Sequence, residues 1–378
     1  MSQFKQISDK NAKVLYLETS ALGQSLLTTP KLNKGSAFSE LERQQFHLRG
    51  KLPYNIEDLS QQVLRCYQQF LKKDNNLEKH LYLRSLHDTN ETLFYKLVSQ
   101  HLTEMLPVLY TPTVGKAVEQ FSQEFQRPRG LYIAYPDRDH IEEIIENRFN
   151  SEVDIIVMTD GAGVLGIGDQ GIGGMDICIV KSMVYVLCGG VNPSRLLPIQ
   201  IDVGTDNEQL LNDPMYLGWR HPRISGKEYD DMVERVVLAI QRKLPQAYLH
   251  WEDFGRENAR RNLERYHQQM CTFNDDMQGT GAVTLVALLS AITRTKVPLT
   301  EQRIVIVGAG TAGTGIADQL CAAMRREGLS QQEALSRFYL VGRHGLLHKA
   351  MPKLTTFYKP YSRSDLSETC TYLFFHDV

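Results

Sequence analysis

"RIVIVGAGTAGTGIADQL", residues 303–320, decides the fold of the last part of the chain. Its first five residues form a short apolar run typical of a buried strand, and the residues after Gly313 favour a helix that ends at Gly328. Between them, Gly308, Gly310 and Gly313 have the G-x-G-x-x-G spacing of a dinucleotide-binding loop. The alternative is an ordinary tight turn. Because strand, glycines and helix occur in the required order, we expect a pyrophosphate at the helix N-terminus. The residues predicted to bind it are Gly308, Ala309, Gly310, Thr311, Ala312 and Gly313.

A second stretch, "VLGIGDQGIGG" at 164–174, has the same glycine spacing at Gly166, Gly168 and Gly171. It does not lie between a strand and a helix in the same way, and Asp169 inside it would repel a phosphate. We therefore interpret it as a glycine-rich bend that brings the chain close to a neighbouring segment.

Composition limits the classes of protein. The 378 residues are 42% hydrophobic and 23% charged with a net charge of -2, which is typical of a globular protein of two or three domains. This balance indicates neither a nucleic-acid nor a membrane partner. The six cysteines form no C-x-x-C pair, the N-terminus resembles no signal peptide, and runs such as "TLVALLSAI" are too short to span a bilayer. We expect a cytoplasmic protein.

The order of predicted elements indicates an α/β fold. Residues 55–105 have helical spacing, and Ser39 is a candidate helix cap. We therefore expect a mainly helical region over 1–125. Short apolar runs then alternate with helical segments, which predicts a parallel α/β domain over 126–277. A Rossmann-like dinucleotide-binding domain, incomplete at its C-terminus, is expected over 278–378. The strands are expected within 130–135, 154–159, 196–203 and 247–254, and the helices within 140–149, 227–244, 258–270 and 279–295.

Two acidic pairs follow predicted strands. Glu252 and Asp253 end one of them, and Asp275 and Asp276 precede a helix. Carboxyl ends of parallel strands are where α/β sheets bind ligands, and converging carboxylates suit Mg²⁺ or Mn²⁺. Solvated strand ends and first-turn charges are the alternatives.

Lys181 and Tyr110 are two further candidates. Lys181 interrupts the apolar run "MDICIVKSMVYVL". Either its side chain extends so that the ammonium reaches the surface, or it is partly buried, which would lower its pKa and make it a possible proton acceptor. Tyr110 precedes a turn at Pro112 and is either a packing residue or an acid.

Seven motifs occur in an order that resembles the large malic enzymes and the related malolactic enzymes, from about residue 30 to about residue 365. They are "KGSAF", "LYTPTVG", "TDGAGVLGIGDQGIGGM", "IDVGTDNEQLLNDPMYLGWR", "WEDF", "CTFNDDMQGTGAV" and "GAGTAGTGIA". The resemblance implies metal-dependent oxidative decarboxylation of L-malate to pyruvate and CO₂ with reduction of NAD(P), in a homodimer or homotetramer.

The same resemblance implies roles for individual residues. Tyr110 is the general acid, Lys181 the general base, and Asp275 pairs with Lys181. The ligands of Mn²⁺ or Mg²⁺ are Glu252, Asp253 and Asp276.

Three features depart from the family pattern. Gly163 stands where malic enzymes have arginine. Malolactic enzymes, which keep NAD bound and release L-lactate, have glycine at this position. Gly342 stands where an acidic residue would bind the ribose of NAD, and Arg343 beside it favours NADP instead. The tail "ETCTYLFFHDV" no longer resembles the family, so we expect a truncated chain. A partial sheet would expose an unpaired edge and apolar faces. Besides a malic and a malolactic enzyme, a non-catalytic remnant is therefore a third alternative for the function of the chain.

Overall fold

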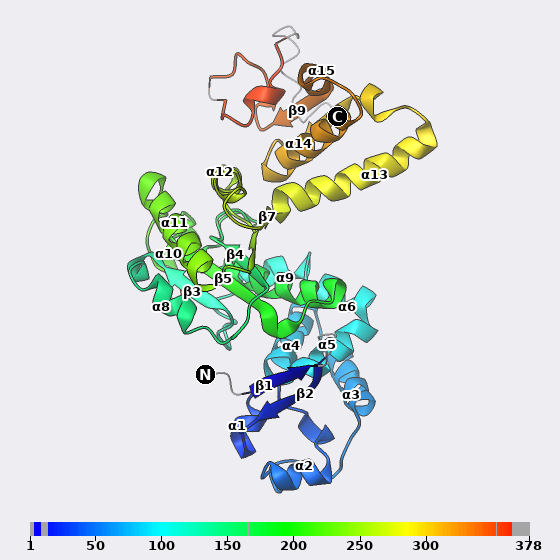
Figure 1. Ribbon diagram of the computed structural model, residues 1–378, viewed down its shortest axis with the longest axis vertical. Helices are drawn as coiled ribbons and strands as arrows, with labels where there is room; N and C mark the ends of the chain where they lie inside the picture. Colours follow the sequence, from blue (N-terminus) through cyan, green and yellow to red (C-terminus); the bar gives the residue numbers. More distant parts are fainter. Residues whose placement is uncertain (1–3, 9–13, 165, 353, 365–378) are drawn as a thin grey trace. The chain divides into compact units, whose positions relative to one another are not determined.

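The computed structural model describes residues 4–8, 14–164, 166–352 and 354–364, and the chain forms two compact units, Met1–Tyr248 and Leu249–Val378 (Figure 1). The tail "ETCTYLFFHDV" lies outside the described residues. The division into three domains at residues 125 and 277 stays a prediction.

The first unit combines helices with a parallel sheet. Its helices are α1 (Gly23–Leu27), α2 (Glu40–Gln45), α3 (Leu59–Leu71), α4 (Asn76–Thr89), α5 (Glu91–Gln100), α6 (Leu102–Leu109), α7 (Thr113–Glu119), α8 (Ile141–Glu146), α9 (Gly174–Gly189), α10 (Glu208–Asn212) and α11 (Gly226–Lys243). Its strands are β1 (Phe4–Ser8), β2 (Val14–Thr19), β3 (Leu131–Ala134), β4 (Ile155–Thr159) and β5 (Leu196–Asp202). These elements confirm the predicted α/β class with a helical N-terminal region.

An antiparallel strand pair lies in the region that the sequence predicted to be mainly helical. β1 pairs with β2, with Phe4 opposite Thr19. The segment "VLYLET" of β2 is rich in residues that favour strands, a signal that the sequence analysis did not use. The Ser39 prediction is confirmed, because its side chain accepts the Glu42 amide in a capping box at the start of α2.

The parallel sheet carries the loops of the first unit at one edge. Its strands run in the order β3, β5, β4, with Leu131 opposite Ile199 and Ile155 opposite Leu196. The amide of Tyr248, the last residue of the first unit and the first residue of β6 (Tyr248–Trp251), donates to the Asp154 carbonyl at 2.7 Å. The glycine-rich bend follows β4 and another long loop follows β5, so both leave the sheet at its carboxyl edge.

Helix α9 forms part of the core of the first unit. It packs on β4 and β5 and against α5 and α7, and every residue from Gly174 to Met183 is buried. Among the described residues, the segment Gly171–Gly189 has the length and apolarity of a membrane span, but 67% of it is buried inside the fold. This burial is typical of a core helix.

The second unit contains the strand, loop and helix predicted at 303–320. Its elements are β6, α12 (Arg256–Tyr266), β7 (Thr272–Asn274), the π-helix η5 (Asp275–Gly279), α13 (Thr280–Thr295), β8 (Ile304–Val307), α14 (Thr311–Arg326), α15 (Gln331–Ser336), β9 (Phe338–Gly342) and β10 (Gly345–Leu346). β8 pairs in parallel with β9, and β9 pairs antiparallel with β10. Leu320, Met324, Phe338 and Leu340 form the centre of its core.

Several apolar side chains of the second unit are exposed in the part of the chain that the structure describes. β8 lies at one end of the strand order β10-β9-β8, and its Val305 and Val307 are 64% and 59% exposed. Val283 and Val286 of α13 are also exposed. The expected truncation of the sheet stays a prediction.

A half-buried ion pair joins the two loops at the carboxyl edge of the first unit's sheet. Both oxygens of Asp169 accept from Arg223, each at 2.7 Å. The same carboxylate accepts from the Gly171 and Asp206 amides and the Thr205 hydroxyl. The interpretation of 164–174 as a close-approach bend is confirmed, because a Cβ on Gly171 would lie 2.1 Å from the Tyr216 hydroxyl oxygen.

Replacing Asp169 by Asn should lower the free energy of unfolding of the chain by about 1–3 kcal/mol, because the substitution leaves the largely buried Arg223 without its carboxylate. Urea unfolding measures the change. Arg242→Ala is the control, since it breaks an ion pair with Glu142 whose side chains are about half exposed. The control substitution should lower the free energy of unfolding by no more than about 1 kcal/mol.

Acidification should remove the difference in the free energy of unfolding between the wild type and Asp169→Asn. Burial raises the pKa of the Asp169 carboxyl, but the hydrogen bond and charge of Arg223 lower it more, so the pKa lies below its ordinary value. A carboxyl of this kind stabilises the fold above its unfolded pKa of about 3.9, and this stabilisation is lost as the pH falls through the folded pKa. A difference that stays constant from pH 7 to pH 2 would contradict the assignment.

Candidate active site

Lys181 and Tyr110 meet within the first unit. Lys181 is 8% exposed in α9, so the structure buries the side chain that the sequence pattern alone left between burial and the surface. Its Nζ lies 4.8 Å from the centre of the half-buried Tyr110 ring, which follows α6. An amine and a phenol so placed are both able to transfer protons to or from a substrate.

In the second unit, two parallel strands bring acidic residues to one edge. β6 pairs with β7, with Trp251 opposite Asn274, and both strands end at these residues. Glu252 and Asp253 therefore follow one strand where Asp275 and Asp276 follow the other. The strand ends explain why residues more than twenty positions apart in sequence converge.

Three of these carboxylates form a buried cluster. One oxygen from each of Glu252, Asp253 and Asp276 lies within 4.8 Å of the others, and each residue is no more than 4% exposed. The Asp253 amide donates to Asp276 Oδ2 at 2.9 Å, which fixes the two carboxylates relative to each other. Asp253 has a φ of 54°, in the left-handed region that non-glycine residues rarely adopt and that occurs preferentially at functional sites.

The cluster fits a hard divalent cation. Two unit charges 4.8 Å apart repel by about 3.5 kcal/mol at an effective dielectric constant of about 20, so three buried carboxylates favour a cation among them. An all-oxygen donor set suits Mg²⁺ or Mn²⁺ better than softer metals. The residues present therefore fit the metal that the sequence predicted.

Asp275 lies at the margin of this cluster. It is half-buried, and His250, Glu252 and Asp275 form a second group of side chains whose ligand atoms lie within 4.8 Å of one another. The predicted pairing of Asp275 with Lys181 would join residues of the two units and stays a prediction.

The dinucleotide loop has the geometry that each glycine requires. Gly308 has a φ of 104°, and a Cβ on Gly313 would lie 2.0 Å from the Gly308 carbonyl oxygen, so the third glycine lets α14 pack on β8. A Cβ on Gly310 would meet no atom within 4 Å, which leaves room for a ligand at the start of α14. Ala309 follows the turn, and Thr311 and Ala312 are the first residues of α14.

The loop and the acidic cluster are linked inside the second unit. Helix α14 packs on η5, and a Cβ on Gly315 would lie 2.5 Å from the Met277 carbonyl oxygen. Tyr358 donates its hydroxyl to the Ala309 carbonyl and accepts from Arg256, whose helix follows the Glu252–Asp253 segment. These contacts fix the glycine loop to the segments that carry the carboxylates.

Arg343 lies exposed in the turn between β9 and β10, and Gly342 is the last residue of β9. This is the strand end at which dinucleotide-binding domains contact the adenosine ribose.

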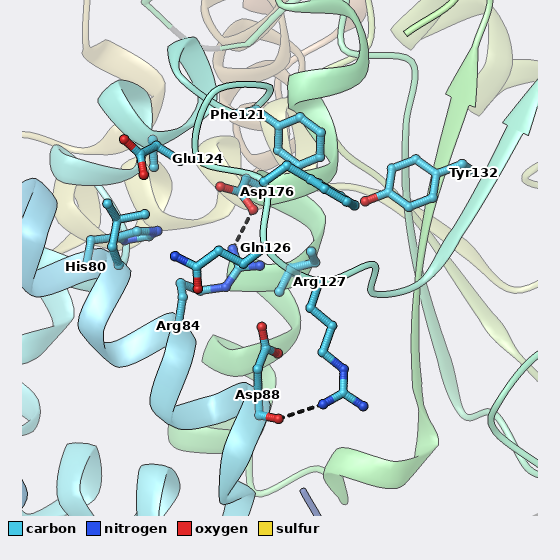
Figure 2. A pocket seen from close by; sticks show the side chains of 13 residues that line it. His80, Arg84, Asp88, Phe121, Glu124, Gln126, Arg127, Tyr132 and Asp176 are labelled. Atoms are coloured by element: carbon cyan, nitrogen blue, oxygen red, sulfur yellow. Dashed lines mark hydrogen bonds and ion pairs between the residues drawn. The ribbon is translucent and has the colours of Figure 1, made fainter. Parts of the chain in front are cut away.

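A cavity of about 40 Å³ in the first unit contains none of the predicted site residues (Figure 2). An Arg84–Asp176 ion pair of 2.5 Å lies at its wall. Among the described residues, the buried His80 Nε2 and Tyr132 hydroxyl beside it have no hydrogen-bond partner. Its small size and these polar atoms suit ordered water rather than a substrate. The sequence alone did not indicate the Arg84–Asp176 pair, because its members are 92 residues apart.

A carboxylate cluster and a glycine-rich loop of dinucleotide-binding spacing within one unit are typical of a class of protein, the metal-dependent enzymes that use a dinucleotide cofactor. Family models agree with this class. The malic enzyme N-terminal domain matches residues 87–267, and the malic enzyme NAD binding domain matches residues 277–371. The chain belongs to the malic enzyme family.

Curated relatives are similar over most of this chain. An NAD-dependent malic enzyme of Aeromonas hydrophila subsp. hydrophila is 51% identical over 341 residues, which are 90% of this chain and 60% of that protein. An NAD-dependent malic enzyme of Vibrio parahaemolyticus is 52% identical over 335 residues, 89% of this chain and 60% of that protein. The chain therefore spans about 60% of the length of these relatives.

Among solved structures, the malic enzyme of Entamoeba histolytica is similar with a TM-score of 0.43 and 22% identity, over 83% of this chain and 55% of that chain.

Substituting the loop glycines by alanine should separate folding from binding. In Gly313→Ala the new methyl group overlaps the Gly308 carbonyl, so we expect a loss of about 1–3 kcal/mol of stability in urea unfolding. Gly310→Ala is the matched control for the fold and should unfold as wild type does. Its methyl group stands where the pyrophosphate would approach, so its NAD⁺ affinity in a fluorescence titration should fall at least about tenfold, or about 1.4 kcal/mol. Wild-type NAD⁺ affinity in Gly310→Ala would contradict the loop assignment.

Proposed function

We propose that the chain catalyses metal-dependent oxidative decarboxylation of L-malate to pyruvate and CO₂ with reduction of NAD⁺. The observation that carries this proposal is the buried cluster of Glu252, Asp253 and Asp276 on segments packed against the dinucleotide loop. Membership of the malic enzyme family supports the substrate, and the names of the curated relatives support NAD.

The three carboxylates would hold Mn²⁺ or Mg²⁺. When bound, such an ion binds oxygen atoms of malate and stabilises negative charge that develops on them. The backbone of the Asp253–Asp276 pair keeps the ligand atoms in place before the ion arrives. Preorganised ligands lower the cost of binding, because little conformational freedom remains to be lost.

Lys181 and Tyr110 would move the protons. We assign Lys181 as the base that takes the proton from the malate hydroxyl, since α9 buries its amine away from bulk water. We assign Tyr110 as the acid that returns a proton to C3 after CO₂ leaves. The contact between the amine and the phenol ring keeps the two groups close enough to act in sequence.

The glycine loop would hold the cofactor, whose nicotinamide accepts the hydride from C2 of malate. We propose NAD as this cofactor. Arg343 is the feature that favours NADP instead, because its exposed guanidinium at the end of β9 could pair with a 2′-phosphate. A homodimer or homotetramer and a cytoplasmic location are proposed on the resemblance and the composition alone.

The test follows ¹³C-labelled L-malate by NMR with the purified chain, Mn²⁺ and either NAD⁺ or NADP⁺. We expect pyruvate and an equal amount of NADH, with slower turnover on NADP⁺. Malate that stays unchanged, although the protein is folded and binds NAD⁺, would contradict the proposal.

Lactate without released NADH would favour the malolactic alternative. The observation behind that alternative is Gly163, a half-buried glycine at a position where malic enzymes have arginine. Gly163→Arg should then shift the product from lactate toward pyruvate.

A further inference from the structure

His250 lies directly behind the proposed metal ligand Glu252. His250 lies in β6, and Glu252 directly follows Trp251, the last residue of that strand. His250 Nε2 lies 2.5 Å from Glu252 Oε2, and the two side chains are 1% and 3% exposed. The Phe273 ring meets the imidazole edge-on at 5.5 Å between ring centres, which limits the orientation of the imidazole.

The contact limits the orientation of the Glu252 carboxylate. An ionised carboxylate only accepts hydrogen bonds, so the imidazole nitrogen that faces it carries the proton and donates. The carboxylate held in this way also contributes one oxygen to the cluster formed with Asp253 and Asp276. Histidines and carboxylates behind metal ligands commonly orient them in this way.

The imidazole could also act as a ligand itself, because His250, Glu252 and Asp275 form the second group of closely spaced donors. The two groups share Glu252. A short hydrogen bond from the imidazole to the carboxylate favours orientation over ligation, because Nε2 cannot donate to Glu252 and bind a cation at once.

We propose that His250 is a positioning residue that orients Glu252 toward the three-carboxylate cluster and so raises its affinity for divalent cations. The inference rests on the proposed function, since it concerns the same metal site. His250 acts as a hydrogen-bond donor in this role. Any donor at the position of Nε2 is therefore expected to orient Glu252 equally well.

The test measures the dissociation constant of Mn²⁺ by the electron paramagnetic resonance signal of the unbound ion. H250Q places an amide nitrogen near the position of Nε2 and should bind Mn²⁺ within about threefold of wild type. H250L has no donor and should bind about 10–100-fold more weakly. If H250L does not fold, H250F replaces it, because phenylalanine keeps a ring of similar size without a donor.

The matched control is T272V, on the opposite face of the same strand pair. Thr272 donates to the Leu249 carbonyl and accepts from the Trp251 indole, so T272V also removes hydrogen bonds at β6. Its Mn²⁺ affinity should equal that of wild type. Thermal unfolding without metal verifies that the variants are folded.

The outcomes separate the inference from the proposed function. Wild-type protein that binds no Mn²⁺ would overturn the metal site and the inference together. Mn²⁺ binding by wild type with equal affinity in H250L would overturn the inference alone. Equal losses in H250Q and H250L would also overturn it, because the imidazole would then act as a ligand and not as a donor.

Discussion

The central constraint on the second unit is the burial of negative charge. Glu252, Asp253 and Asp276 bring three carboxylates within 4.8 Å of one another where water has little access. Such an arrangement is costly unless a cation and surrounding donors stabilise it. The local structure serves this purpose. Parallel strands end at one edge, Asp253 takes a left-handed backbone conformation, and its amide donates to Asp276.

In the first unit, arginine side chains supply the positive charge that stabilises carboxylates with little access to water. Asp169 pairs with Arg223 through both of its oxygens, and Asp176 pairs with Arg84. In each pair a guanidinium matches a carboxylate on a distant segment, so the interaction fixes a loop or a helix in place. The glycine spacing at 166–171 therefore serves the fold, whereas the same spacing at 308–313 leaves space at a helix N-terminus where a dinucleotide could bind.

The sequence predicted what depends on local patterns. The glycine spacing with its strand and helix, the Ser39 cap and the acidic residues at strand ends all follow from short-range rules. The burial of Lys181 was left open, because its neighbours in sequence do not reveal that the first ten residues of α9 are buried by other elements. The partner of Asp169 is 54 residues away, and the contact of His250 with Glu252 depends on where β6 ends. Contacts of these kinds are set by the tertiary fold, so composition and periodicity could not supply them.

The most direct test is a crystal of the chain grown with MnCl₂ and measured at the manganese absorption edge. We predict one anomalous peak among the carboxylates of Glu252, Asp253 and Asp276, with His250 still hydrogen-bonded to Glu252. The absence of a peak at these residues, or a peak on His250, Glu252 and Asp275, would contradict the assignment of the three buried carboxylates as the metal site.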